Sequence, residues 1–256
     1  MIKFAVAGAL GRMGTLVIQE AAKVGDLQLV AGFDVAGAGM ILPGGVPVSD
    51  ASQLKSTLAS SKAVVLIDFT VASAAVETVC SAADMGIDLV VGTTGFSPDQ
   101  LSRMKAAIDG RVSAVITPNF SVGVNLFWKL VAEAATALKD YDIEIIEAHH
   151  NQKRDAPSGT ALATVEAIKN ALGDREVVHG REGLRQRGNE IGVHAVRAGD
   201  IVGDHTVLFA GPGERLEIKH QAHSRAAFAA GAVRAARWVV DKEPGIYSMA
   251  DVLGSR

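Results

Sequence analysis

The sequence predicts an α/β protein of two domains, one built on a doubly wound parallel sheet and one α+β domain with a mixed or antiparallel sheet. Two observations predict this. Over the first 120 residues, short apolar runs alternate with segments of helical period, which is the rhythm of parallel strands joined by helices. Beyond Asn119, strand-like runs follow one another with only turn signals between them, a pattern typical of a mixed or antiparallel sheet.

The first domain is predicted to alternate strands with helices. The strands are expected over 2–7, 28–33, 64–69, 89–91 and 112–116, and the helices over 13–24, 71–85 and 97–108. Ser97 and Pro98 mark the clearest helix start, because serine caps the first N–H groups of a helix and proline suits its first position. Aromatic residues make up only 5% of the chain, so Ala, Val, Ile and Leu must form the core.

The second domain is predicted to combine helices over 121–138 and 158–172 with strands over 142–148, 191–196, 206–210 and 215–219. An alanine-rich helix over 225–240 is expected to return to the first domain. The segment 173–190 mixes charged residues with glycines and is predicted to be a long, mobile loop. These boundaries assign 1–119 and 226–256 to the first domain and 120–225 to the second.

Composition excludes several classes of protein. The chain has 256 residues, 48% of them apolar and 21% charged, and a net charge of −3, which favours neither nucleic acid nor an anionic membrane as a partner. The longest uncharged stretch, 112–128, contains Pro118 and Asn119 and is a poor membrane span. The single cysteine, Cys80, allows no intrachain disulfide and no cysteine-based metal site. With no secretory signal at the N-terminus, we expect a soluble cytoplasmic protein.

A glycine-rich stretch directly follows the first predicted strand. It reads Gly8-Ala9-Leu10-Gly11-Arg12-Met13-Gly14 and opens the first helix. Glycine lets the backbone approach a pyrophosphate, and the start of a helix offers N–H groups to its charge. The spacing is G-x-x-G-x-x-G rather than the common G-x-G-x-x-G, and a purely structural turn is the alternative. We interpret the first domain as Rossmann-like and dinucleotide-binding.

Asp34 ends the second predicted strand, 20 residues beyond Gly14. An acidic side chain there can accept hydrogen bonds from the adenosine ribose hydroxyls and would repel a 2′-phosphate. The next residue is Val35, so no arginine follows to bind that phosphate. The pair favours NADH, while Arg12, the nearest cation, leaves NADPH use open. An ordinary aspartate in a turn is the alternative interpretation.

Two further segments follow predicted strands of the same sheet. Small and hydroxyl residues at Gly92-Thr93-Thr94 could approach a nicotinamide without a clash. Thr117-Pro118-Asn119-Phe120 stands where the first domain passes to the second and is expected to line the cleft between them. Each segment taken alone could be a plain loop, but their positions on successive strands favour a cofactor site.

The stretch from Glu144 to Ala161 carries the strongest chemical signal. It reads as a strand, a polar loop and a helix start, and the loop holds His149, His150, Lys153 and Arg154. Histidine can carry a proton near neutral pH, and a cation beside it can hold an anionic substrate. Pro157-Ser158-Gly159-Thr160 opens a helix whose N–H groups also favour an anion. Together these features suit a small dicarboxylate.

Three other interpretations of this loop are open. It could be a solvated basic turn. The adjacent histidines could be metal ligands, but neighbouring residues on a strand point to opposite faces and no third ligand stands at a useful spacing, so no metal is expected. Contact with nucleic acid is disfavoured because the loop has no aromatic residue and the net charge is negative.

The motifs as a set resemble the dihydrodipicolinate reductase family. The resemblance covers essentially the whole chain, and the His-His to Ser-Gly-Thr string is far more specific than any glycine motif. The segments that carry it are Gly8 to Gly14, Asp68-Phe69-Thr70, Val91 to Phe96, Pro118 to Gly123, Glu147-Ala148-His149-His150 through Gly159-Thr160-Ala161, His194 to Gly203 and Arg215 to Ile218.

The resemblance implies NADH- or NADPH-dependent reduction of a cyclic, unsaturated dicarboxylate, 4-hydroxy-tetrahydrodipicolinate, to tetrahydrodipicolinate in lysine and diaminopimelate biosynthesis. It implies that the first domain binds the nucleotide, and that the second binds substrate and forms a homotetramer. By position, it makes His149 the proton donor and acceptor and Lys153 a second donor. It assigns the substrate carboxylates to His150, Gly159 and Thr160, and the cofactor to Gly8, Ala9, Leu10, Gly11, Arg12, Met13, Asp34, Gly92, Thr93, Thr94, Thr117, Pro118, Asn119 and Phe120.

Arg225, just past the last predicted strand, is a further candidate for a substrate carboxylate. The chain departs from many family members at Val35, where they carry an arginine, and this puts a preference for NADPH in doubt. Two rival hypotheses are a different oxidoreductase of similar architecture, such as a semialdehyde or homoserine dehydrogenase, and a non-enzymatic NAD(H) sensor. The intact histidine loop argues against the first, and the presence of both His149 and Lys153 argues against the second.

Overall fold

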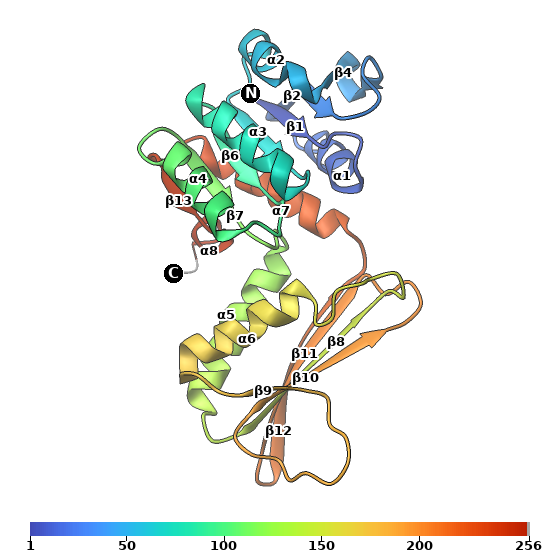
Figure 1. Ribbon diagram of the computed structural model, residues 1–256, viewed down its shortest axis with the longest axis vertical. Helices are drawn as coiled ribbons and strands as arrows, with labels where there is room; N and C mark the ends of the chain where they lie inside the picture. The colour runs from blue at the N-terminus through green and yellow to red at the C-terminus, as the bar shows by residue number, and fades with distance from the viewer. Residues whose placement is uncertain (255–256) are drawn as a thin grey trace. The chain divides into compact units, whose positions relative to one another are not determined.

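The computed structural model describes residues 1–254, which fall into two compact units (Figure 1). The first unit comprises residues 1–122 together with the chain from Ala226 onward, and the second comprises Gly123–Arg225. Residues 255 and 256, which the predicted first domain includes, lie outside the described residues. Between residues 1 and 254 no helix has the length and hydropathy needed to cross a membrane.

The first unit is built on an eight-stranded sheet in the order β13-β7-β6-β5-β1-β2-β4-β3. Every pair in it is parallel except β3 with β4. The doubly wound parallel sheet predicted from sequence is therefore confirmed. Its strands are β1 (Ile2–Ala7), β2 (Leu27–Asp34), β3 (Ile41–Leu42), β4 (Val46–Asp50), β5 (Val65–Asp68), β6 (Asp88–Val91), β7 (Ser113–Ile116) and β13 (Gly245–Tyr247).

Helices cover both faces of this sheet because its strands are apolar on both sides. Phe4 and Val6 of β1 belong to the core beneath one set of helices, and Ala5 and Ala7 belong to the core beneath the other. The first set is α1 (Arg12–Ala21), α7 (Ala226–Val239) and α8 (Met249–Val252). The second set is α2 (Leu54–Ser61), α3 (Ala72–Asp84) and α4 (Pro98–Ile108).

The start of α4 follows the prediction closely. The Ser97 hydroxyl accepts a hydrogen bond from the Gln100 N–H at 3.2 Å, and the Gln100 side chain accepts one from the Ser97 N–H at 2.8 Å. Elements that the sequence analysis did not predict are short: β3, β4, β13, α2 and α8. Pieces of this length show too few periods to be recognised locally and are defined by the neighbours against which they pair.

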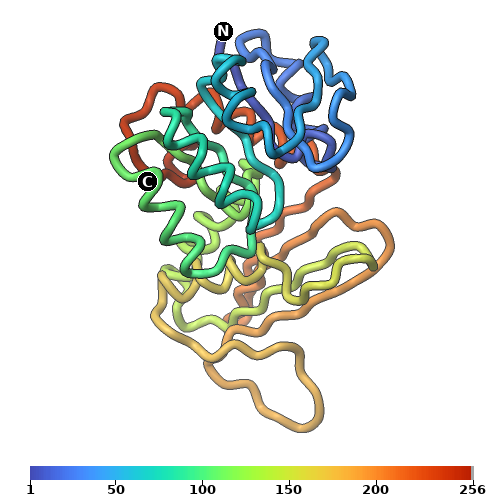
Figure 2. The backbone as a smooth tube through the Cα atoms, turned by 45° about the horizontal axis from the view of Figure 1, so that its top comes forward, coloured from blue at the N-terminus to red at the C-terminus, as the bar shows by residue number. Residues whose placement is uncertain are grey.

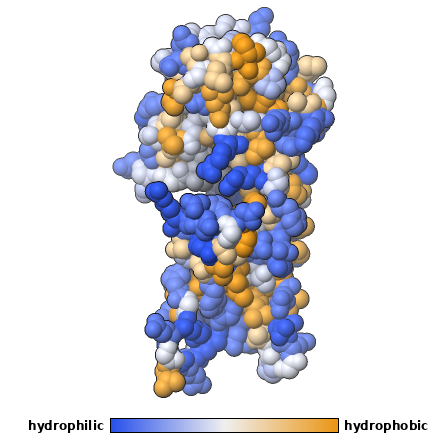
Figure 3. Space-filling view, turned by 90° about the vertical axis from the view of Figure 1, so that its right-hand side faces the viewer, coloured by the Kyte–Doolittle hydropathy of each residue, from blue (hydrophilic) through white to orange (hydrophobic). Residues whose placement is uncertain are grey.

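The second unit carries a mixed sheet in the order β12-β11-β8-β10-β9, as predicted. Its strands are β8 (Asp142–His149), β9 (Val177–His179), β10 (Ile191–Arg197), β11 (Gly203–Gly211) and β12 (Glu214–Ala222). Alternate residues of β8 and β11 pack beneath α5 (Val122–Ala137) and α6 (Gly159–Leu172), which lie on one side of the sheet in Figure 1. Figure 3 looks from the other side, where orange apolar side chains lie among blue hydrophilic ones.

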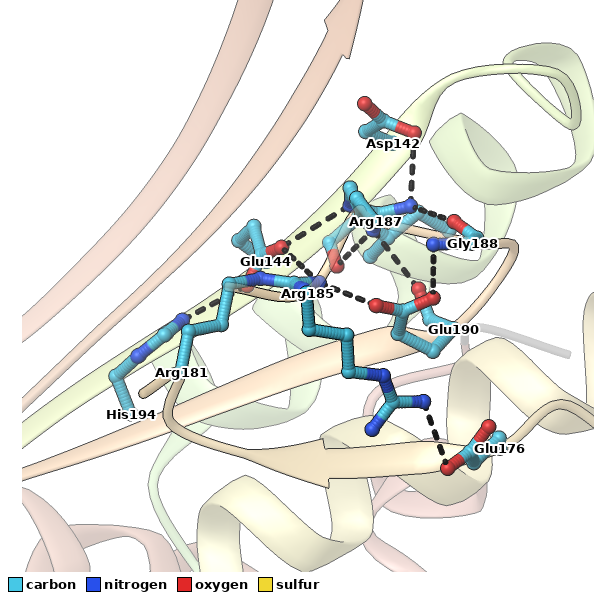
Figure 4. Close-up of polar contacts among 10 residues, drawn as sticks. Asp142, Glu144, Glu176, Arg181, Arg185, Arg187, Gly188, Glu190 and His194 are labelled. Carbon is cyan, nitrogen blue, oxygen red and sulfur yellow. Dashed lines mark hydrogen bonds and ion pairs between the residues drawn. The ribbon is translucent and has the colours of Figure 1, made fainter. Parts of the chain in front are cut away.

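The prediction of a long loop over 173–190 was wrong in part, because the segment holds β9, which pairs parallel with β10. Figure 2 traces the segment between α6 and β10. Its second half is held against the sheet by ion pairs with β8. Arg187 donates to Asp142 at 2.7 Å and to Glu144 at 3.2 Å. Arg181 pairs with the buried Glu190 (Figure 4). The two Arg187 contacts link residues 43 and 45 positions apart, so a local sequence pattern does not reveal them.

Glu190→Gln should make the unfolding free energy less sensitive to acid. The Arg181 hydrogen bond, with backbone N–H groups, holds the pKa of Glu190 down at about 2 although burial acts to raise it. The stabilisation is therefore present above the unfolded-state pKa of about 4.3 and is lost as the pH falls from there. Urea unfolding between about pH 5 and pH 2 should show a smaller loss of stability in the variant than in the wild type.

Glu182→Gln is the matched control, because Glu182 is exposed in the same segment. It should follow the wild-type pH dependence. Equal acid sensitivity of Glu190→Gln and the wild type would contradict the role given to this ion pair.

Candidate functional site

The turn between β1 and α1 depends on a close backbone approach at Gly14. A Cβ added there would lie 2.0 Å from the carbonyl oxygen of Gly8, so no other residue fits without moving the helix. Gly11 is the N-cap of α1, and glycine has no side chain that could accept a hydrogen bond from the first N–H groups of the helix. The first N–H groups of α1 therefore lie at the sheet edge without a side-chain cap, which is the arrangement that favours a bound anion.

Asp34, at the end of β2, holds this turn in place. One carboxylate oxygen accepts the N–H of Leu10 at 2.9 Å, and the other accepts the N–H of Val35 at 2.8 Å. A cavity of about 280 Å³ lies beside it, lined by Gly8, Gly11, Asp34 and mostly apolar side chains from β2, α2 and α3. None of the lining residues is a lysine or arginine. Of the other predicted residues in this turn, Ala9 is buried in the core and Arg12 is exposed.

The loops after β5 and β6 are joined by a buried carboxylate, Asp68. It accepts hydrogen bonds from the Thr93 hydroxyl at 2.7 Å and from the N–H of Thr70 at 3.1 Å. Burial raises the pKa of Asp68, and the hydrogen bonds from Thr93 and Thr70 oppose that rise. From the sequence, Asp68 was recognised only as part of a motif. Its position at the end of a buried strand was the one local indication that it lies at the edge of the sheet where the cofactor segments meet.

Phe69 packs against two of the segments predicted to bind the cofactor, at Gly92 and at Phe120. A Cβ on Gly92 would lie 2.1 Å from the Phe69 ring, so the ring requires a glycine at that position. The rings of Phe69 and Phe120 meet edge to face at 5.8 Å. They border a cavity of about 240 Å³. It is lined by Met13, Phe69, Gly92, Thr94, Pro118, Asn119, Phe120 and Phe228. The structure thus brings residues of three predicted cofactor segments together around one cavity, while Thr117 is buried and hydrogen-bonds within its own turn.

In the second unit, His149 ends β8 and is bonded to a fully buried glutamate. Its Nδ1 lies 2.6 Å from Oε2 of Glu147. Both Glu147 oxygens also accept hydrogen bonds from Arg197, each at 2.9 Å, and Oε1 accepts the N–H of Ser158 at 2.9 Å. Glu147 and Arg197 lie within the motifs that carry the family resemblance, but no role was predicted for either residue from the sequence. Both belong to strands whose alternation puts them on the same side of the sheet as His149.

The charges around His149 act in opposite directions. Burial lowers the pKa of His149, while the hydrogen bond and charge of Glu147 act to raise it. Burial also acts to raise the pKa of Glu147, but hydrogen bonds from Arg197, His149 and the Ser158 N–H outweigh it, and the net shift is downward. Glu147 is therefore an ionised carboxylate at neutral pH, and burial makes the free imidazole of His149 the favoured form.

Lys153 lies in the loop that leaves His149. Its side chain is mostly buried, and the ammonium donates to the Asp155 carboxylate at 2.9 Å. Arg197 donates to the Asp155 carbonyl at 2.6 Å. The same loop carries His150, which is half-buried. Gly159 and Thr160 are the first two residues of α6, after Ser158, whose hydroxyl caps the helix by accepting the Ala161 N–H at 3.2 Å. Arg225 ends the second unit directly before α7.

His205, on β11, is a buried residue of this site that sequence reasoning missed. Its Nε2 lies 3.1 Å from the Ser158 hydroxyl, and its ring meets the His149 ring edge to face at 5.2 Å. Burial lowers the pKa of His205 to about 4, so it is neutral at physiological pH. It pairs with Glu147 across the β8–β11 ladder. Within the described residues, no three His, Cys, Asp or Glu side chains gather as a metal site would need.

Comparison with known proteins assigns the chain to a family. The family model "Dihydrodipicolinate reductase, N-terminus" matches residues 2–120, and "Dihydrodipicolinate reductase, C-terminus" matches residues 123–253. The chain belongs to the dihydrodipicolinate reductase family. Its reaction is the reduction of 4-hydroxy-tetrahydrodipicolinate in lysine and diaminopimelate biosynthesis, with a reduced nicotinamide cofactor. The resemblance read from the sequence motifs is confirmed, and the dehydrogenase and sensor alternatives are set aside.

Similar proteins agree over the full length. A 4-hydroxy-tetrahydrodipicolinate reductase of Methanosarcina barkeri is 57% identical, with 99% of this chain and 100% of that protein covered. One of Methanothermobacter thermautotrophicus is 52% identical, with 99% of each covered. Dipicolinate-bound dihydrodipicolinate reductase from Paenisporosarcina sp. TG-14 superimposes with a TM-score of 0.83 at 27% identity, covering 98% of each chain. An amine dehydrogenase from Mycobacterium smegmatis, at 14% identity, covers 97% of this chain and 95% of its own with a TM-score of 0.63, and shares the fold alone.

Proposed function

We propose that the first unit binds the nicotinamide cofactor and that the second binds the dicarboxylate substrate and supplies its proton. The observation that carries this is the convergence, in one loop, of His149, Lys153 and the start of α6. Two proton-carrying groups and the positive end of a helix dipole lie together there, which suits a dianion.

The chemistry requires an acid at this place. The 4-hydroxyl of the substrate leaves as water, which gives the conjugated imine. Hydride addition to that imine leaves an electron pair shared between nitrogen and carbon, and a proton must quench it. His149 has Nδ1 engaged by Glu147, so Nε2 is the atom that exchanges the proton. Lys153 is the second donor. A bound dianion would raise the pKa of His149 and so recover the imidazolium that burial disfavours.

The substrate carboxylates are proposed to lie at the start of α6, against Gly159 and Thr160, with His150 and Arg225 as further partners. The relative from Paenisporosarcina binds dipicolinate, a planar dicarboxylate of the same class. A helix N-terminus favours such groups because its N–H groups and dipole both attract negative charge.

His149→Gln should lower kcat by about 10²-fold or more, because the acid that quenches the carbanion is lost. The affinity for NADH should not change, since no cofactor residue is touched. Steady-state kinetics and fluorescence titration with NADH measure the two quantities. His179→Gln, an exposed histidine of β9, is the control and should retain full activity. Unchanged kcat in His149→Gln would remove the proton-transfer role.

The cofactor is proposed to be NADH, bound by the glycine turn, Asp34, Gly92 to Thr94 and Thr117 to Phe120, with NADPH also accepted. The cavity beside Asp34 is lined by no cation that could bind a 2′-phosphate, and the following residue, Val35, is 82% exposed. The carboxylate of Asp34 would repel that phosphate. The apolar wall of the same cavity suits an adenine ring.

Val35→Arg should raise the ratio of kcat/KM for NADPH to that for NADH by about tenfold, the effect of one charge-assisted hydrogen bond to the 2′-phosphate. Val64→Arg introduces the same change just before β5, at the opposite edge of the sheet, and should leave the ratio unchanged. Rates with each cofactor, followed at the reduced-nicotinamide absorbance band, give the ratio. No change in Val35→Arg would contradict the placement of the ribose beside Asp34.

We also propose a homotetramer that works in the cytoplasm, where reduced nicotinamide is available. The face of the second sheet opposite α5 and α6 exposes Ile146 and Val196, at 42% and 44%. These residues lie on neighbouring parallel strands. Apolar side chains on an uncovered sheet face are typical of an interface between subunits.

Ile146→Glu should weaken this assembly, because it places a charge in the proposed interface. Light scattering should give a mass near four times 26.6 kDa for the wild type and a smaller mass for the variant. Ile41→Glu, on the exposed strand β3 of the first unit, is the control and should keep the wild-type mass. A monomeric wild type would contradict the proposal.

A further inference from the structure

We propose that Glu147, held by Arg197, is a positioning residue for the reaction: it directs Nδ1 of His149 away from the substrate, leaves Nε2 for proton transfer, and joins the imidazole to the start of α6. This inference rests on the proton-transfer role proposed for His149. It concerns two residues that the sequence motifs contain but to which the family resemblance assigned no role.

Each oxygen of the Glu147 carboxylate takes part in two hydrogen bonds. The residue is 0% exposed. Oε2 accepts from Arg197 Nη1 and lies 2.6 Å from His149 Nδ1, while Oε1 accepts from Arg197 Nη2 and the Ser158 N–H. A buried carboxylate with four hydrogen bonds to three residues cannot rotate without breaking several bonds at once, so it acts as a rigid connection between β8, β10 and the start of α6.

This bonding decides the tautomer of His149. An ionised carboxylate only accepts hydrogen bonds, so Nδ1 must donate to Glu147 and carry the ring's first proton. The second proton is therefore gained and lost at Nε2. Nε2 faces Gly203, where an added Cβ would lie 3.1 Å away, so the absence of a side chain leaves room beside the reactive nitrogen.

Of the charged groups that shift the pKa of His149 in the described part of the chain, Glu147 is the one that favours the imidazolium. Lys153, from the loop, and Arg197, from β10, both lower the pKa of His149, as does burial. His205, from β11, packs its neutral ring against His149. Glu147 thus provides the negative charge that opposes these effects and allows His149 to be protonated when substrate binds.

Arg197 extends the same arrangement to the second proton donor. Beyond its two bonds to Glu147, it donates to the Asp155 carbonyl, and the Asp155 carboxylate pairs with Lys153. One arginine therefore connects the partner of His149 with the partner of Lys153. The spacing of the two donors depends on this connection rather than on the loop sequence alone.

The test is the titration of His149 in the full-length enzyme by NMR of a histidine-labelled sample, in which the His149 signal is identified by its loss in His149→Gln. Glu147→Gln keeps the size of the side chain and removes its charge. It should move the His149 midpoint to lower pH by about one unit or more. The loss of kcat at high pH should move in the same direction, because the protonated form is the acid.

Arg197→Gln should move the midpoint the opposite way, to higher pH, because a cation beside the ring is removed. This variant also tests the proposal if Glu147→Gln does not fold. General loosening of the site would expose the ring and raise the midpoint in both variants, so opposite signs distinguish positioning from a merely structural role. Glu77→Gln is the matched control, since exposed Glu77 also receives two bonds from one arginine, Arg103, at 2.6 and 2.9 Å.

An unmoved His149 midpoint in both Glu147→Gln and Arg197→Gln, or a rise in both, would overturn the positioning role. Full turnover in His149→Gln would instead overturn the proton transfer on which this inference rests. The two proposals are therefore tested separately: the positioning role by the His149 titration in Glu147→Gln and Arg197→Gln, and the proton transfer by kcat of His149→Gln.

Discussion

The second unit depends on the compensation of one buried charge. Removing a carboxylate from water costs several kcal/mol unless hydrogen bonds and an opposite charge replace the lost solvation. Glu147 meets this cost with hydrogen bonds to Arg197, His149 and the N–H of Ser158 at the start of α6, three residues from three separate places in the chain. A carboxylate placed this way requires the strands, the loop and the helix to keep their mutual positions. The geometry proposed for proton transfer is therefore a consequence of satisfying a single buried group.

The first unit also contains a buried carboxylate that joins separate segments, but the pKa of this one is shifted in the opposite direction. Asp68 is also 0% exposed, and it joins the loops after β5 and β6 through Thr70 and Thr93. It has only hydroxyl and N–H partners, so burial raises its pKa, whereas the arginine beside Glu147 keeps that carboxylate ionised. A carboxylate that only has to hold loops needs no counter-charge. One that has to favour a cationic imidazole must stay negative, and this explains why an arginine accompanies it.

Local patterns in the sequence were sufficient for most of the fold and for part of the site. The glycine turn, the Ser97 helix start and the alternation of β8 each reflect a constraint within a few residues, so they are visible in the printed order. Short elements such as α2 and β13 were missed because their boundaries depend on neighbours. The segment 173–190 was misjudged for the same reason: its anchors, Asp142 and Glu144, lie about 45 positions earlier.

The α/β fold class, the family and the residue types available for hydride and proton chemistry follow from the printed sequence, because motifs of fixed spacing carry that information. The partners of these side chains follow from the folded arrangement alone. It placed Arg197 and Ser158 on Glu147, His205 against His149, and Phe69 beneath Gly92. These contacts join strands that are distant in the chain, and the physical quantities they control, burial and the pairing of buried charge, exist only once the chain has folded.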